Sequence, residues 1–140
     1  MSTLNNVPTG ELILRTAPRP IDTNMNGDIF GGWIMSQMDV AGGMMAIETA
    51  GGRVVTVAVD AMKFIKPVKV SDIVCCYGKV VRTGTTSITI RLEVWAKPIL
   101  PEPHIHKENE AFMVTEASFT YVAIDHLGRK RPLPEHKPNV

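Results

Sequence analysis

Residues 31–61, GGWIMSQMDVAGGMMAIETAGGRVVTVAVDA, contain the pattern that decides the fold. The part from Trp33 to Ala50 has no proline, few β-branched residues and four methionines, which is typical of a helix. One glycine pair precedes this helix, and a second pair, Gly51 and Gly52, is expected to end it. The sequence therefore predicts one long helix early in the chain.

After residue 52 the hydrophobic period changes from helical to alternating, which predicts a strand. Successive side chains of a strand point to opposite faces of its sheet. One face is therefore expected to carry Val55, Val57, Val59 and Ala61. The other face is expected to carry Thr56, Ala58 and Asp60.

Four more segments have the composition of strands. They are Glu11–Arg15, Ile73–Val81, Thr86–Ala96 and Phe112–Ile124. The turn sequence Arg82-Thr83-Gly84-Thr85 predicts a hairpin between the second and third of these. The apolar face of Thr86–Ala96 is expected to cover the helix. Together these elements predict an α+β domain in which a curved antiparallel sheet wraps a long central helix.

The length and charge of the chain restrict its class. With 140 residues it can form one ordinary domain, and a net charge of +1 gives no basic field for nucleic acid. No apolar run reaches the roughly 20 residues that span a bilayer, and the opening residues do not resemble a signal peptide, so we expect a cytoplasmic protein. The adjacent cysteines, Cys75 and Cys76, would point to opposite faces of a strand, so we expect reduced, structural thiols.

The chain divides into an N-terminal extension at residues 1–9, a domain at residues 10–124 and a polar tail at residues 125–140. An open sheet has two edges, and exposed edges favour pairing with a second copy. We therefore expect a homodimer.

Asp39 is the charged residue on a stripe of small side chains along the predicted helix. Helical geometry places seven residues within about 60° of it. They are Gly32, Met35, Ser36, Gly42, Gly43, Ala46 and Ala50. Glycine inside a helix costs roughly 1 kcal/mol relative to alanine, so we expect close approach of another backbone or of a narrow ligand as compensation. A carboxylate in such a groove is a candidate base for activating water, although a solvated or salt-bridged aspartate is the ordinary alternative.

The start of the helix offers the complementary group. Free N–H groups around Gly31 and Gly32 carry partial positive charge and can hold a developing oxyanion. Asp39 lies seven residues beyond Gly32, about 10 Å along the helix. One carbonyl cannot reach both groups of a single helix, so the aspartate is expected to come from a second subunit.

The loop before the helix resembles the first half of a calcium-binding loop, with Asp22, Asn24, Asn26 and Gly27 at the required spacing. The match ends there, because the position of the bidentate glutamate is occupied by Trp33. Local turn chemistry that places amide donors beside the helix start is the better interpretation.

Read as one unit, residues 22–39, DTNMNGDIFGGWIMSQMD, closely resemble the YciA-type acyl-CoA thioesterases. The blocks Arg53–Val59, Met62–Val68 and Asp72–Gly78 are similar to the following blocks of this family. The resemblance implies a hotdog fold, dimers that commonly assemble into hexamers as trimers of dimers, and hydrolysis of acyl-CoA to a free acid and CoA. It implies no metal and no other cofactor.

The resemblance also implies roles for individual residues. Asp39 falls at the catalytic carboxylate of the family and Asn24 at an asparagine that places or polarises the reactants. Gly31 and Gly32 fall at the helix start that holds the thioester carbonyl. Whether Asp39 acts as a general base or as a nucleophile stays open.

CoA carries phosphates, so basic residues and a hydroxyl-rich turn are candidate CoA-binding groups. The basic candidates are Lys63, Lys66, Arg82 and Arg91, with Lys97, Arg129, Lys130 and Arg131 as further ones. The turn candidates are Thr83, Gly84, Thr85 and Ser87. Any of these can equally be a solvated surface group.

Three other functions compete with this hypothesis. A dehydratase or hydratase of the same fold usually needs a histidine, and all four histidines follow the helix and its partner strands. A serine hydrolase is disfavoured because there is no Gly-x-Ser-x-Gly motif. A non-catalytic acyl-CoA binding or sensing module remains the main alternative. The pair His104-Ile105-His106 is expected to lie in a surface loop.

Overall fold

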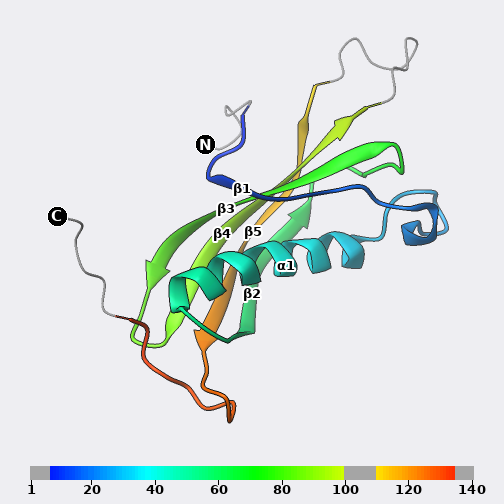
Figure 1. Cartoon of the computed structure of the whole chain (residues 1–140). Helices are drawn as coiled ribbons and strands as arrows, with labels where there is room; N and C mark the ends of the chain where they lie inside the picture. The colour runs from blue at the N-terminus through cyan, green and yellow to red at the C-terminus, as the bar shows by residue number, and fades with distance from the viewer. Residues whose placement is uncertain (1–6, 100–109, 135–140) are drawn as a thin grey trace.

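The computed structural model of the chain describes residues 7–99 and 110–134. One helix lies across one face of a curved five-stranded sheet (Figure 1). The elements in chain order are β1 Glu11–Thr16, the 3-10 turn η2 Pro20–Asp22, α1 Gly31–Ala50, β2 Val54–Phe64, β3 Asp72–Thr83, β4 Ser87–Pro98 and β5 Phe112–Ala123. The strand order is β1-β3-β4-β5-β2, and every neighbouring pair is antiparallel.

This arrangement confirms the expected fold class, the long helix and the hairpin. β3 and β4 pair along their length, and Gly84 N–H donates to the carbonyl of Ser87 at 2.8 Å to close the turn between them. α1 begins at Gly31, two residues before the expected start, and ends at Ala50; its C-cap, Gly51, adopts the left-handed conformation at φ 69°. Glycine ends the helix there because it reaches positive φ without steric cost.

The core lies between α1 and the inward face of β4 and β5. The predicted apolar face of β4 is completely buried; it consists of Ile88, Ile90, Leu92 and Val94. From the helix, Ile34 and Met38 pack into the same cluster. Burying one such side chain stabilises the fold by about 1.5–3 kcal/mol, so this face fixes the helix on the sheet.

A β-bulge in β2 changes the faces that the alternating pattern predicted. Thr56 pairs with Tyr121 and Val59 pairs with Phe119, with a register shift between Thr56 and Ala58. Because paired residues of an antiparallel ladder share a face, Thr56 and Val59 lie on the helix side together. The expectation that Val55, Val57 and Val59 share one face is therefore wrong, because one extra residue in the strand reverses the alternation.

The group that packs against the small-residue stripe of α1 also differs from the expected one. A Cβ atom added at Gly42 would lie 2.3 Å from the hydroxyl oxygen of Tyr121, whereas one added at Gly32 or Gly43 would meet nothing within 4 Å. The close approach at Gly42 comes from a side chain of β5 in the same chain. It does not come from a second backbone, and Gly32 and Gly43 face open space in the single chain.

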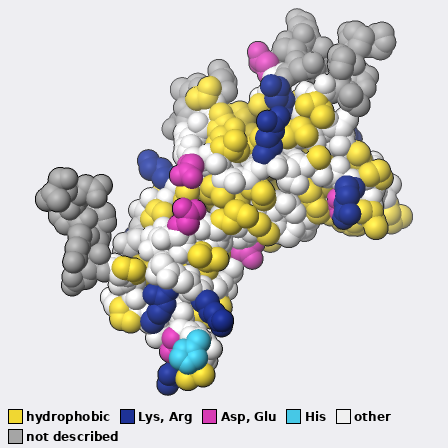
Figure 2. All heavy atoms as spheres, in the orientation of Figure 1, with side chains coloured by type: hydrophobic (Ala, Val, Ile, Leu, Met, Phe, Trp, Pro, Cys, Tyr) yellow, Lys and Arg dark blue, Asp and Glu magenta, His cyan; other side chains and the backbone are white. Residues whose placement is uncertain are grey.

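β2 is an edge of the sheet, and its apolar side chains are exposed in the single chain. Val55, Val57 and Val59 are 42%, 55% and 41% exposed. Apolar side chains on α1 are exposed as well, including Val40 at 48% and Met44 at 44%. Hydrophobic side chains gather across the middle of the face that carries the helix (Figure 2). Exposed apolar side chains gathered on one face in this way mark an association surface.

The segment after β5 covers the end of the helix. Leu133 packs against the core and donates its N–H to Thr85 at 2.8 Å. The Arg131 guanidinium donates to the carbonyl of Ala50 and to that of Ile124, both at 3.0 Å. Arg131 therefore satisfies a carbonyl at the end of α1, where a positive charge also suits the helix dipole.

Some expectations fall on residues that the structure does not describe. The His104-Ile105-His106 loop, the first six residues of the N-terminal extension and the last six of the tail lie outside the described residues. In the described part of the chain, no helix has the length and apolar character needed to span a membrane.

Replacing Arg131 with alanine should lower the free energy of unfolding by about 2 kcal/mol, because it leaves two carbonyl acceptors without a charged donor. Chemical denaturation measures this change. Lys130→Ala, next to it on the exposed surface, is the control and should change the unfolding free energy by less than about 0.5 kcal/mol. Equal effects of the two variants would contradict the capping role of Arg131.

Cys76 should resist alkylation in the folded protein. Burial, and then the charge of Cys75, raises the pKa of the Cys76 thiol to about 12. Since the thiolate is the reactive form, iodoacetamide at pH 8.5 should label Cys76 at least about a hundredfold more slowly in the folded than in the unfolded protein. The measurement uses a Cys75→Ala variant, in which Cys76 is the single thiol. Equal labelling rates in the two states would contradict the buried, protonated thiol.

Candidate active site

Asp39 lies in the middle of α1, where its carboxylate meets two strands. The Thr56 hydroxyl on β2 donates to Oδ1 at 2.7 Å, and the Tyr121 hydroxyl on β5 donates to the same oxygen at 3.0 Å. Thr56 pairs with Tyr121 in the β2–β5 ladder, so both side chains lie on this side of the sheet. Within the described residues, Oδ2 has no hydrogen-bond partner. The described residues thus hold the carboxylate through Oδ1 and leave Oδ2 available for another partner.

Tyr121 is the buried member of this group, with 1% of its surface exposed. Burial, and then the nearby Asp39 carboxylate, raises the pKa of the Tyr121 phenol far above its ordinary value. The phenol therefore stays protonated at physiological pH and acts as a hydrogen-bond donor to Asp39.

The start of α1 has unused backbone donors. Its N-cap residue is Phe30, whose side chain has no oxygen to accept a hydrogen bond. Within residues 7–99 and 110–134, neither Gly31 nor Gly32 donates its N–H to another residue. These groups, together with the helix dipole, can hold an oxygen that carries partial or full negative charge.

Asn24 is fixed beside the helix start by a turn of its own loop. Its Oδ1 accepts the N–H of Asn26 at 2.8 Å and that of Asp28 at 3.1 Å. Because both partners are donors, the side-chain oxygen faces the loop and Nδ2 faces away from it. An ion pair between Lys69 and Asp28 holds the same loop. Asn24 is thus positioned to offer an amide N–H outward.

A hollow of about 290 Å³ joins the helix start and the Asn24 loop. Its lining consists of Asn24, Asp28, Ile29, Gly31, Ile34, Phe64, Ile65, Lys66, Pro67 and Val68. Asp39 is absent from this lining. The sequence-predicted site is therefore in two parts within one chain, with Asn24 and Gly31 at the hollow and Asp39 about two helical turns away.

The candidate CoA-binding residues are also dispersed. Lys66 lines the hollow, and its ammonium group lies 5.2 Å from the centre of the Phe112 ring. Lys63 is exposed near the same end of β2. The β3–β4 turn, which carries Arg82, Thr83, Gly84, Thr85 and Ser87, lies instead at the end of the sheet near the C-terminus of α1 (Figure 1).

Three of the basic candidates already have partners. Arg91 forms an ion pair with Glu116, Arg129 forms one with Asp125, and Arg131 donates to two carbonyl groups. All three are therefore less available to phosphate than Lys63 and Lys66. The described residues contain no group of three or more His, Cys, Asp or Glu side chains suited to hold a metal.

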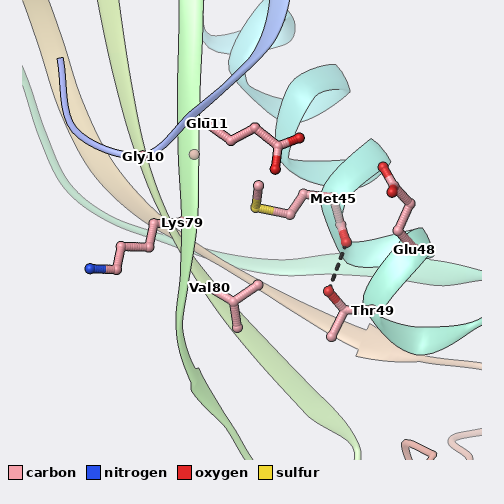
Figure 3. A pocket seen from close by; sticks show the side chains of 8 residues that line it. Gly10, Glu11, Met45, Glu48, Thr49, Lys79 and Val80 are labelled. Carbon is pink, nitrogen blue, oxygen red and sulfur yellow. Dashed lines mark hydrogen bonds between the residues drawn. The ribbon is translucent and has the colours of Figure 1, made fainter. Parts of the chain in front are cut away.

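A larger hollow of about 510 Å³ lies between β1, β3 and the second half of α1 (Figure 3). Glu11 and Glu48 are among its lining residues, and their carboxylates would repel the phosphates of CoA. The carboxylate of the smaller hollow, Asp28, is paired with Lys69. Asp39 lines neither hollow, so it is the donors of Asn24 and the helix start that favour the smaller one.

Thr56 and Tyr121 are the contacts of Asp39 that sequence reasoning missed. Tyr121 lies 82 residues from Asp39 in the chain, and Thr56 faces Asp39 through its pairing with Tyr121 across the β2–β5 ladder. The pattern of the sequence contains no signal for either contact. A threonine in an alternating strand and a tyrosine in a core strand are both ordinary.

Comparison with known proteins gives an independent result. Residues 26–101 match the family described as the thioesterase superfamily. The chain is 55% identical over 134 residues to the acyl-CoA thioester hydrolase YciA of Salmonella typhimurium, and the alignment covers 96% of this chain and 98% of that protein.

Solved structures agree with this result. A hexameric thioesterase from Yersinia pestis is 56% identical, with a TM-score of 0.85 over 92% of this chain and 100% of that one. A more distant acyl-CoA hydrolase from Staphylococcus aureus, solved in complex with butyryl-CoA, CoA and CoA disulfide, is 27% identical. Its TM-score is 0.74, over 91% of this chain and 73% of that one.

Proposed function

This chain belongs to the thioesterase superfamily, as a relative of the YciA-type acyl-CoA thioester hydrolases, and from this membership we propose that it hydrolyses acyl-CoA to a free carboxylic acid and CoA. Asp39 carries the proposal, because its carboxylate is anchored through Oδ1 and its Oδ2 has no partner among the residues that the structure describes. An anchored carboxylate beside a thioester adds little to affinity and can add much to turnover.

The site is shared between two subunits. Gly32 and Asp39 are about 10 Å apart along one helix, so one thioester carbon cannot be within reach of both in the same chain. A second copy whose helix runs antiparallel alongside would bring its Asp39 to the first copy's helix start. The exposed apolar side chains of β2 and α1, such as Val57 and Met44, support such a contact. Higher assembly, as in the hexameric Yersinia relative, is part of the proposal.

The proposed reaction uses donors from one subunit and the base from the other. The thioester carbonyl oxygen accepts the N–H of Gly31 or Gly32 and the Nδ2–H of Asn24, which stabilise the charge that develops on it. Asp39 of the partner subunit takes a proton from water as the water attacks the carbonyl carbon. The carbon–sulfur bond then breaks, and the proton passes to the leaving thiolate. Direct attack by Asp39, followed by hydrolysis of the anhydride, is the variant of this scheme that remains open.

The pantetheine and phosphates of CoA approach from the side of the hollow. Lys66 lines it and Lys63 is close in the chain, so these two are the proposed phosphate partners. The β3–β4 turn can contribute only if the assembly brings it from another subunit, because in the single chain it lies near the far end of α1. A cytoplasmic location is likewise a proposal; the free thiols Cys75 and Cys76 support a reducing compartment.

The first test is thiol release from a panel of acyl-CoA esters. Wild type should release CoA, and Asp39→Asn should lower kcat by about a hundredfold or more, the scale of an acid–base group. Glu48→Gln, on the opposite side of the same helix, is the matched control and should retain wild-type kcat. If wild type binds acyl-CoA without releasing thiol at any chain length, the protein is a binding or sensing module and the proposal is wrong.

Mixing two inactive variants tests the shared site. Asp39→Ala and Asn24→Ala chains should each be weak alone. After joint unfolding and refolding in equal amounts, about a quarter of all sites should combine an intact Asn24 with an intact Asp39 if dimers form at random. Turnover should therefore recover to about a quarter of the wild-type value. No recovery in mixed dimers identified by native mass spectrometry would place both groups of each site in one chain.

A further inference from the structure

Tyr121 is a core residue that carries a polar hydroxyl group. Its ring is buried and stacks on Phe119, with 6.4 Å between the ring centroids. Its hydroxyl lies 3.0 Å from Oδ1 of Asp39 and 3.2 Å from the main-chain carbonyl oxygen of the same residue. A phenylalanine would fill the same volume of the core, apart from the oxygen. Packing of the core therefore does not explain why this side chain carries a hydroxyl group.

Gly42 makes room for this hydroxyl. Any Cβ atom at position 42 would lie 2.3 Å from the Tyr121 oxygen and 2.9 Å from Leu92. Glycine is unfavourable in the interior of a helix, where it raises the entropy cost of folding. Gly42 lies about three turns after the start of α1, where the Tyr121 phenol reaches Asp39. Space for the phenol therefore compensates for the cost of glycine at this position.

The two hydroxyl donors hold Asp39 from different strands. Thr56 on β2 and Tyr121 on β5 both donate to Oδ1, while the described residues leave Oδ2 without a partner. Two fixed donors on one oxygen restrict the rotation of the carboxylate. β2 is an exposed edge strand, whereas Tyr121 is anchored in the core, so Tyr121 is the more rigid of the two supports.

We propose that Tyr121 is a positioning residue for the proposed thioester hydrolysis: its hydroxyl, accommodated by Gly42, orients Asp39 so that Oδ2 faces the reacting water or thioester. This inference rests on the proposed function. Tyr121 itself does not touch the substrate and transfers no proton. Burial and the Asp39 carboxylate raise the pKa of its phenol, so the hydroxyl stays a donor throughout the pH range of an assay.

The test removes the oxygen alone. Tyr121→Phe keeps the stacked ring and should lower kcat for acyl-CoA by about tenfold, the scale of one hydrogen bond to a charged group, with KM within about twofold of wild type. The chain provides a matched control in its other tyrosine, Tyr77 on β3, whose Tyr77→Phe variant should keep wild-type kcat. An unchanged kcat in folded Tyr121→Phe would overturn the proposal, even if its melting temperature fell.

A double-mutant cycle separates positioning from general stabilisation. In an Asp39→Ala background there is no carboxylate to orient, so adding Tyr121→Phe should leave the residual turnover unchanged. A further tenfold loss in that background would mean that Tyr121 acts independently of Asp39. Gly42→Ala is a second variant, which displaces the phenol without removing it, and should lower kcat in the same direction as Tyr121→Phe. Wild-type kcat in folded Gly42→Ala would contradict the role given to this glycine.

A spectroscopic measurement distinguishes the failure of this inference from that of the proposed function. If wild type releases no thiol from any acyl-CoA, the proposed function is wrong, whatever the role of Tyr121. The carbon-13 resonance of the Asp39 side-chain carboxyl then tests the contact directly, assigned by its loss in Asp39→Ala. A shift of this resonance in Tyr121→Phe, with none in Tyr77→Phe, supports the contact. Identical resonances in wild type and Tyr121→Phe overturn it.

Discussion

Burial of one face of α1 against β4 and β5 is the interaction on which the other features depend. Leu92 and Tyr121 press so closely on the helix that only glycine fits at position 42. This contact sets the rotation of the helix about its axis, because residues on one face of a helix move together. Asp39 is consequently held at the junction of α1, β2 and β5, where hydroxyl groups from two strands reach it.

The same packing leaves the single chain incomplete in two ways. At the helix start, Phe30 cannot cap the first N–H groups through its side chain, and Gly31 lines the hollow beside Asn24. Along β2, apolar side chains such as Val57 stay exposed on an unpaired edge. Both features are unfavourable in an isolated chain, and a second copy and a substrate carbonyl would satisfy them. The proposed function and the proposed assembly thus each depend on one of these unsatisfied features.

Local chemistry explains which candidate site residues could be named from the sequence. Gly31 belongs to a helix start whose free N–H groups are readable from consecutive positions, whereas the role of Asn24 came from the family resemblance. Asp39 stood out as a charge on a helix stripe of small residues. Thr56 and Tyr121 were not predictable, because a hydrogen bond between residues 82 positions apart depends on strand register, which alternation alone does not specify.

The sequence by itself determined the long helix, the strands, the β3–β4 hairpin and the carboxylate at position 39, because each follows from local periodicity or turn chemistry. Only the tertiary structure decided the bulge in β2, which placed Val59 on the face of Thr56, and the pairing of Thr56 with Tyr121 beside Asp39. It also decided that Gly42 accommodates the Tyr121 phenol instead of a second backbone. The physical reason is that strand register and close packing are set by contacts between distant segments, and one inserted residue exchanges the two faces of a strand.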